Sequence, residues 1–188
     1  MSMRSIELVL DASSDSLIRA DWTRLAAAGV PSQAGHTSPS NSPHITLAAG
    51  PDLTVQYLTV QDPTVPDNAD DLWQGLPLAL EFSGIQVFTS GAGKYVLARS
   101  VVVTAALLDL HRALHERVAG ALPLTMPDAW TPHVTLARRV PGHLLGTALD
   151  LLELRGEGQC TAARHWDSTT RTITSLGPFG QELPRVPG

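Results

Sequence analysis

The sequence of 188 residues contains a single cysteine, Cys160. An intrachain disulfide and a metal site built from several cysteines are therefore excluded, and cysteine usage gives no sign of an oxidising compartment. Long apolar runs are also missing: none approaches the length that spans a membrane, and residues 1–10 lack the apolar centre of a signal peptide. These absences predict a cytoplasmic protein without a membrane segment.

Basic residues are scarce as well. There are 13 Lys and Arg against 18 Asp and Glu, which gives a net charge of −5. Proteins that hold long nucleic acid through its backbone display a broad basic surface, so the charge argues against such a partner and leaves open a nucleotide or a short RNA end. A chain of this length buries on the order of 70% of its unfolded surface in one core. We expect a single domain over residues 1–188 and a monomer.

Two seven-residue stretches repeat each other. They are Ser-Pro-His-Ile-Thr-Leu-Ala at 42–48 and Thr-Pro-His-Val-Thr-Leu-Ala at 131–137. Because alternate residues of a strand point to opposite faces, an extended backbone puts His44 and Thr46 on one face of the first stretch. It does the same for His133 and Thr135 in the second. A Pro before each His suits the first residue of a strand, so the pattern predicts two strands, each with a polar pair on one side.

Such a pair of strands suits acid-base chemistry on a phosphate. One neutral imidazole can take a proton from an attacking oxygen while a second, protonated imidazole supplies a proton to the departing oxygen. A Thr hydroxyl two residues along can donate to a non-bridging phosphate oxygen. This chemistry requires no metal and no other cofactor. One half-buried His is most often a hydrogen-bonded structural residue, so the interpretation depends on the repetition.

The paired His-x-Thr motifs resemble those of the two-histidine phosphoesterase superfamily, which includes the RNA 2′,3′-cyclic phosphodiesterases, also called 2′-5′ RNA ligases. The resemblance implies that His44 and His133 are the catalytic residues, with His44 as the proton donor and His133 as the base that activates water. It also implies that Thr46 and Thr135 bind the phosphate and that a basic residue at Arg138 contributes to this binding. The product that it implies is the 2′-phosphate.

The alternation of side chains along a strand offers Arg139 as an alternative to Arg138. Strand alternation places Arg139, not Arg138, on the face of His133, unless a bulge or the end of the strand turns the side chain. Both could equally be solvated arginines at the end of a strand.

The remaining pattern predicts strands and helices in mixed order. Strands are expected at 5–10, 76–88, 94–103, 159–166 and 171–176, and helices from the Asp11 region to Gly29, from Thr104 to about 119 and from about 143 to 154. Residues 52–60 and 68–74 give weak signals for a strand and a short helix. This order favours an α+β fold. The family resemblance implies two pseudo-symmetric lobes of mainly antiparallel sheet, with outer helices and a central cleft.

Two further patterns resemble functional motifs. His111 and His115 lie one turn apart on a predicted helix, a spacing that can bind metal, but the Glu of the zinc-protease helix and a third ligand are missing. A solvated helix face is the better interpretation. The run Gly91 to Lys94 lacks the full spacing of a phosphate-binding loop and precedes a strand, so it predicts a hairpin turn. Trp130 is expected in the core.

The sequence thus predicts a metal-independent enzyme that hydrolyses the 2′,3′-cyclic phosphate of an RNA end or a small nucleotide. Two alternatives stay open. The same site run backwards would join a cyclic phosphate to a 5′-hydroxyl, as a 2′-5′ RNA ligase, and a non-catalytic module could hold a nucleotide or RNA end without turnover.

Overall fold

The computed structural model describes residues 2–36, 38, 40–55 and 71–176. Its framework is a strand-helix-strand unit that occurs twice. The first unit consists of β1 (Arg4–Leu10), α1 (Ala12–Ala27) and β2 (His44–Gly50), and the second of β5 (Lys94–Val101), α2 (Ala105–His115) and β7 (His133–Pro141). In both, the two strands pair antiparallel. Each unit ends on one of the two His strands, which gives the expected pseudo-symmetry.

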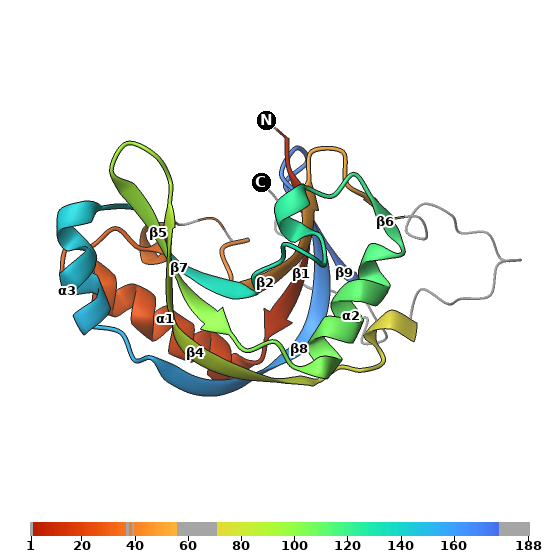
Figure 1. The fold of residues 1–188 in the computed structure, drawn as a ribbon, viewed down its shortest axis with the longest axis horizontal. Helices are drawn as coiled ribbons and strands as arrows, with labels where there is room; N and C mark the ends of the chain where they lie inside the picture. The colour runs from red at the N-terminus through yellow and green to blue at the C-terminus, as the bar shows by residue number, and fades with distance from the viewer. Residues whose placement is uncertain (1, 37, 39, 56–70, 177–188) are drawn as a thin grey trace, which may run out of the picture.

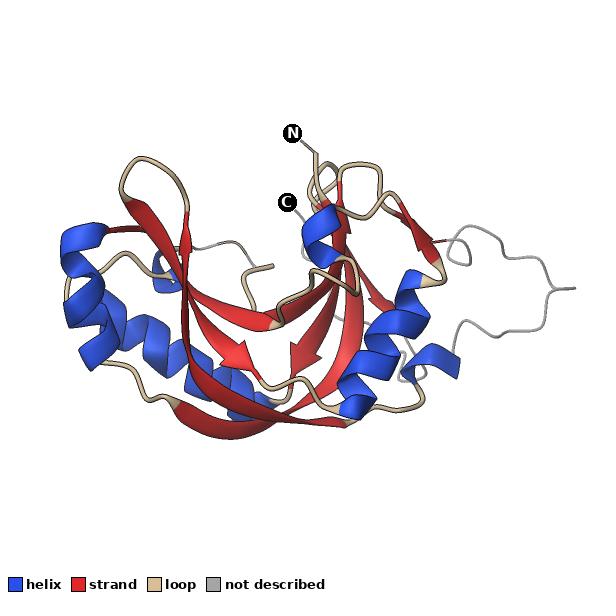
Figure 2. Cartoon of the chain, viewed as in Figure 1, coloured by secondary structure: helices blue, strands red, loops and turns tan. Residues whose placement is uncertain are grey.

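Two long strands join the units. β4 (Leu78–Thr89) pairs with β5, and β8 (Arg155–Asp167) pairs with β4 through its first half and with β1 through its second. The sheet order is β1-β2-β7-β5-β4-β8-β9, with β9 at Thr172–Leu176, and the β1–β8 pairing closes six strands into a ring. Figures 1 and 2 show the strongly curved sheet, with α1 and α3 (Leu145–Asp150) on one side of the molecule and α2 on the other. The predicted α+β class is confirmed.

Short elements complete the description. They are β3 (Thr54–Val55) paired with β6 (Val118–Ala119), and the 3₁₀ turns η1 (Gln33–Gly35), η2 (Asp71–Trp73), η3 (Pro123–Thr125) and η4 (Gly142–Leu144). The strand expected at 52–60 and the short helix expected at 68–74 fall partly on residues 56–70, outside the described residues. Only their ends can be followed, as β3 and η2.

Helix α1 forms where the sequence predicts it. The Asp11 carboxylate caps it by accepting the backbone N–H of Ser14. Ile18, Trp22 and Leu25 recur at helical spacing and are at most 3% exposed. Burying each such side chain contributes roughly 1.5–3 kcal/mol, so packing against the sheet is the main stabilisation of this helix.

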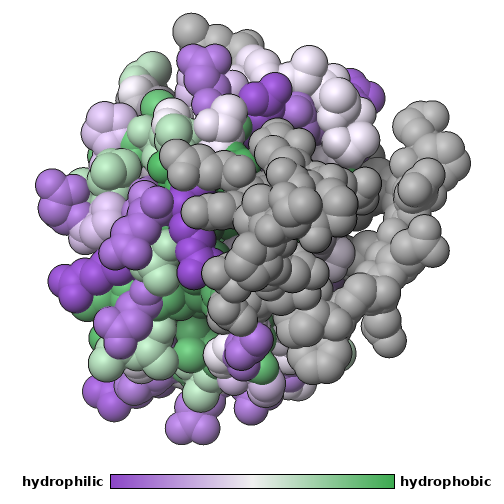
Figure 3. All heavy atoms as spheres, turned by 90° about the vertical axis from the view of Figure 1, so that its right-hand side faces the viewer, coloured by the Kyte–Doolittle hydropathy of each residue, from purple (hydrophilic) through white to green (hydrophobic). Residues whose placement is uncertain are grey.

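Helix α2 starts as predicted, with the Thr104 hydroxyl accepting the N–H of Leu107. It ends at His115, four residues before the predicted end, because Val118 and Ala119 pair with β3 instead. That partner is distant in sequence, so helical periodicity alone could not reveal it. Figure 3 views the molecule from the right of Figure 1, the side on which α2 lies, and shows hydrophilic residues scattered among hydrophobic ones in its described part. None of the described helices is both long and apolar enough to cross a membrane.

Candidate active site

The two His strands meet in the middle of the sheet. β2 and β7 are antiparallel and pair at Ile45 and Val134, both fully buried. In an antiparallel register the neighbours of such a pair face each other, so the motif His of each strand lies opposite the motif Thr of the other. The two rings are close enough for the positive charge of His44 to contribute to lowering the pKa of His133. The structure therefore brings the four predicted motif residues together on one face.

The contact between the two His strands is short. Pro132, the residue before His133, directs its carbonyl toward β5, where it accepts the N–H of Val101 at 3.1 Å. The strands pair at one position and then diverge, each staying with its other neighbour, β1 or β5.

Both imidazoles are held in the same way. Nδ1 of His44 donates to the carbonyl of Ser42, and Nδ1 of His133 donates to the carbonyl of Thr131, each at 2.7 Å. Because a carbonyl only accepts, Nδ1 must carry the proton in both rings. In the neutral ring the free lone pair is then on Nε2, the atom available for proton transfer.

Behind His44 lies a charged pair that the motif analysis missed. Glu7 of β1 pairs with Thr46 on one side and Arg164 of β8 on the other. One carboxylate oxygen lies 3.5 Å from Nε2 of His44 and accepts from the Ser5 hydroxyl at 2.6 Å, and the other accepts from Nε of Arg164 at 2.7 Å. Burial alone would raise the pKa of Glu7, but the charges of His44 and Arg164 and the hydrogen bonds lower it. The carboxylate is therefore ionised beside the His44 ring.

A signal for this pair was present in the sequence. Glu7 lies between Ile6 and Leu8 in a short strand, and both neighbours are fully buried. A carboxylate embedded in an apolar strand is rarely left unpaired, so its presence indicates a cationic partner. The identity of that partner depends on the β1–β8 pairing, which sequence pattern alone does not give.

His133 has a different environment. Its ring lies 5.2 Å from the Phe88 ring between centroids, and Ser100 is its neighbour across the β5–β7 ladder. Burial lowers the pKa of His133, the hydrogen bond to Thr131 opposes this, and the charges of His44 and Arg138 lower it further. These effects favour a neutral imidazole at pH 7.

The arginines that follow the second motif are placed by a bulge. Thr135 and Ala137 of β7 pair with adjacent residues of β5, so β7 holds an extra residue there, and Arg139 has a φ of 58°. The regular alternation of side chains between the two faces of β7 is therefore interrupted between Thr135 and the arginines. The charge of Arg138 acts on His133, and both arginines are exposed.

The interpretation of His111 and His115 as a solvated helix face is wrong. His111 is fully buried, and its Nε2 lies 3.0 Å from the carbonyl oxygens of both Leu47 and Thr125. Nε2 of His115 lies 3.1 Å from the same Leu47 oxygen. The His111 ring stacks on Trp130, with centroids 3.8 Å apart and planes within 7°. Burial is the main cause that lowers the pKa of His111 to about 4.

The position of His111 on α2 accounts for its burial. It lies four residues after Leu107 and three before Leu114, so it belongs to the same inner stripe. Within the described ranges, no group of three or more His, Cys, Asp or Glu could hold a metal. Trp130 is partly buried and packs against the core, as predicted.

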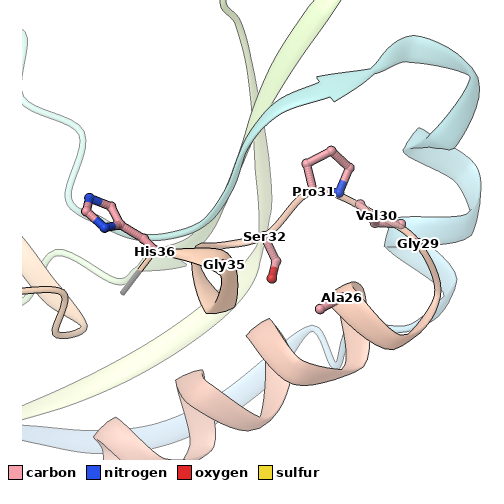
Figure 4. Close-up of a pocket in the computed structure, with 7 residues that line it drawn as sticks. All are labelled: Ala26, Gly29, Val30, Pro31, Ser32, Gly35 and His36. Atoms are coloured by element: carbon pink, nitrogen blue, oxygen red, sulfur yellow. The ribbon is translucent and has the colours of Figure 1, made fainter. Parts of the chain in front are cut away.

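Other parts of the surface lie apart from this site. The turn of the β4–β5 hairpin lies at 90–93, as predicted, and Lys94 begins β5. A surface hollow of about 720 Å³ lies beside the end of α1 and η1 (Figure 4). It is lined by Ala26, Gly29, Val30, Pro31, Ser32, Gly35 and His36. None of these belongs to either motif.

A model of the 2′-5′ RNA ligase superfamily matches residues 14–167, a range that includes both His-x-Thr motifs. The chain belongs to the 2′-5′ RNA ligase superfamily. A crystal structure of E. coli LigT complexed with 3′-AMP is similar, with 17% sequence identity, coverage of 93% of this chain and 94% of that chain, and a TM-score of 0.47. A comparison with curated proteins gave no match. Membership in a superfamily of phosphoesterases and ligases confirms the resemblance seen in the motifs.

Proposed function

We propose that this member of the 2′-5′ RNA ligase superfamily hydrolyses the 2′,3′-cyclic phosphate of an RNA end or a small nucleotide to the 2′-phosphate. One observation carries the proposal. His44 and His133 stand on adjacent antiparallel strands, and each has Nδ1 tied to a carbonyl, so two Nε2 atoms are available for proton transfer. A single phosphate between two such rings has a base on one side and an acid on the other.

The environments of the two rings suggest their roles. A base must be neutral, and burial lowers the pKa of His133, so its Nε2 can accept a proton from water at neutral pH. The oxygen of that water forms a bond to phosphorus as the bond from phosphorus to the 3′ oxygen breaks. His44 then gives the proton on its Nε2 to the departing oxygen. The Glu7 carboxylate lies 3.5 Å from this Nε2.

Phosphate binding falls to the hydroxyls and the arginine. Thr46 and Thr135 share the face of the histidines, where their hydroxyls can donate to the non-bridging oxygens as negative charge builds. Arg138 lies near His133 and adds a positive charge on that side. These residues can bind the phosphate without a metal.

The test is incubation with 2′,3′-cyclic AMP and with an oligonucleotide ending in a cyclic phosphate, in the presence of EDTA. The expected result is 2′-phosphate product, with turnover lost in His44→Ala and in His133→Ala. Joining of the cyclic end to an added 5′-hydroxyl oligonucleotide, without hydrolysis, would favour the ligase. Binding without turnover would favour a non-catalytic module, and either result would overturn the proposal.

A further inference from the structure

The backbone carbonyl of each motif Thr accepts a hydrogen bond from a tryptophan side chain. The indole N–H of Trp22 donates to the carbonyl of Thr135 at 3.1 Å, and that of Trp130 donates to the carbonyl of Thr46 at 2.9 Å. The exchange is reciprocal. Trp22 belongs to α1 of the first unit and binds β7 of the second, whereas Trp130 precedes β7 in the second unit and binds β2 of the first.

The diverging strands create the need for these donors. Where β2 and β7 separate beyond Ile45 and Val134, neither strand can supply the other with backbone N–H groups. A carbonyl left without a donor in a partly buried place is costly, so side chains from outside the ladder take over. At Leu47, the next carbonyl along β2, these are the imidazoles of His111 and His115.

We propose that Trp22 and Trp130 are positioning residues that set the spacing of the two His-x-Thr pairs. By fixing the carbonyl of each motif Thr, the indoles fix the backbone on which that Thr and the preceding His stand. The role assigned here rests on the proposed function. Trp130 is the tighter link, because it lies three residues before His133 in the chain while its side chain binds Thr46 of the other strand.

Both indoles are themselves held in place. Trp22 is 3% exposed, and the Arg19 guanidinium lies 5.3 Å from its ring centroid. Trp130 stacks on His111, whose ring is anchored in turn by two carbonyls. A donor that is held rigidly restrains the position of the carbonyl that accepts from it. Residues that support an active site act in this way.

The experiment compares Trp22→Phe and Trp130→Phe with Trp73→Phe. Phenylalanine keeps an aromatic ring but removes the N–H. Trp73 is a buried tryptophan of η2 that makes no hydrogen bond to either motif strand in the described part of the chain, so it provides the matched control. We expect kcat on 2′,3′-cyclic AMP to fall roughly ten- to a hundredfold in the first two variants, with KM changed less than about threefold. A fall no larger than that of Trp73→Phe would overturn the proposal.

A second measurement separates this proposal from the proposed function. Nuclear magnetic resonance of the ring nitrogens follows the titration of His44 and His133 without any substrate. Trp130→Phe should shift the midpoints or the ring resonances of both histidines, and Trp73→Phe should not. If the unmodified protein fails to turn over the cyclic nucleotide but these shifts occur, the proposed function fails and the positioning role stands. If the resonances are unchanged, the positioning role fails whatever the activity.

Discussion

The two strand-helix-strand units carry the same motif but surround it differently. In the first unit, the Glu7–Arg164 ion pair lies behind the His, and the segment around residues 120–125 covers the end of the strand. There the carbonyl of Ala49 accepts from Leu122 at 2.7 Å. In the second unit, the equivalent end of β7 carries Arg138 and Arg139, both exposed.

This difference teaches that a repeated motif need not have repeated roles. The first unit places an ionised carboxylate beside its imidazole, which suits a ring that must hold a proton. The second unit places its half-buried imidazole near the charge of Arg138, which suits a ring that must accept a proton. The fold supplies the same ring orientation twice, and under the proposed function the surroundings of the two rings would distinguish acid from base.

The largest effect should come from replacing one ring at a time. Removing the base in His133→Gln should abolish the rising, low-pH limb of the kcat/KM profile, and removing the acid in His44→Gln should abolish the falling limb. Each change should lower the rate by roughly 10²–10⁴-fold, the usual contribution of a general acid or base. Because burial lowers the pKa of His133, the rising limb should have its midpoint below the ordinary histidine value of about 6.5. Loss of the same limb in both variants would contradict the division of roles.

The buried ion pair offers the next largest effect. Glu7→Gln should lower the free energy of unfolding by about 3–5 kcal/mol, because it leaves Arg164 buried without its counter-charge. Asp15→Asn breaks a more exposed pair with Arg19 and should cost less than about 1 kcal/mol. Chemical denaturation measures both. Equal losses would mean that the first unit is not held together by its buried charges.

Gly50 and Arg139 each lie six residues after the motif His of their strand. Replacing Gly50 tests why the first unit has no side chain at this position. A Cβ at Gly50 would overlap the carbonyl oxygen of Gly120, so Gly50→Ala should cost about 1–3 kcal/mol of unfolding free energy. The control is Gly146→Ala in α3, where a Cβ meets nothing within 4 Å. The higher helix propensity of Ala should raise the free energy of unfolding by as much as about 1 kcal/mol. Thermal unfolding of the two variants should shift in opposite directions. A neutral Gly50→Ala would show that the segment over β2 can move aside.

The smallest expected effect is at the arginines. Arg138→Met should raise KM for the cyclic nucleotide several-fold, since the ionic contact of an exposed side chain contributes at most about 1 kcal/mol. Arg139→Met should change KM less than about twofold. Steady-state kinetics at low salt measures both. If Arg139→Met has the larger effect, the bulge in β7 does not turn Arg138 toward the site.

The two motif strands, with His and Thr on one face of each, were predictable because a repeat with period-two alternation is a local signal, whereas their pairing at Ile45 and Val134 was not predicted. The end of α2 was not, because the β3–β6 pairing joins residues far apart in sequence. His111 was misjudged for a related reason. Its polar ring was assigned to solvent although its spacing from Leu107 and Leu114 placed it on the inner stripe, where two carbonyls satisfy it.

Glu7 and Arg164 show the other limit of the sequence. The apolar neighbours of Glu7 indicate that it has a cationic partner, but Arg164 is identified as that partner only by the closure of the sheet, which brings β1 and β8 together. The same holds for the two indole contacts, which link α1 to β7 and the chain before β7 to β2. Such contacts follow from the topology, and the sequence around each tryptophan gives no local sign of them.

The ladder between β2 and β7 has one pair, fewer than any other two neighbouring strands of the ring. The connection between the two halves of the site therefore depends on side chains, because the indoles of Trp22 and Trp130 each reach from one unit to a strand of the other.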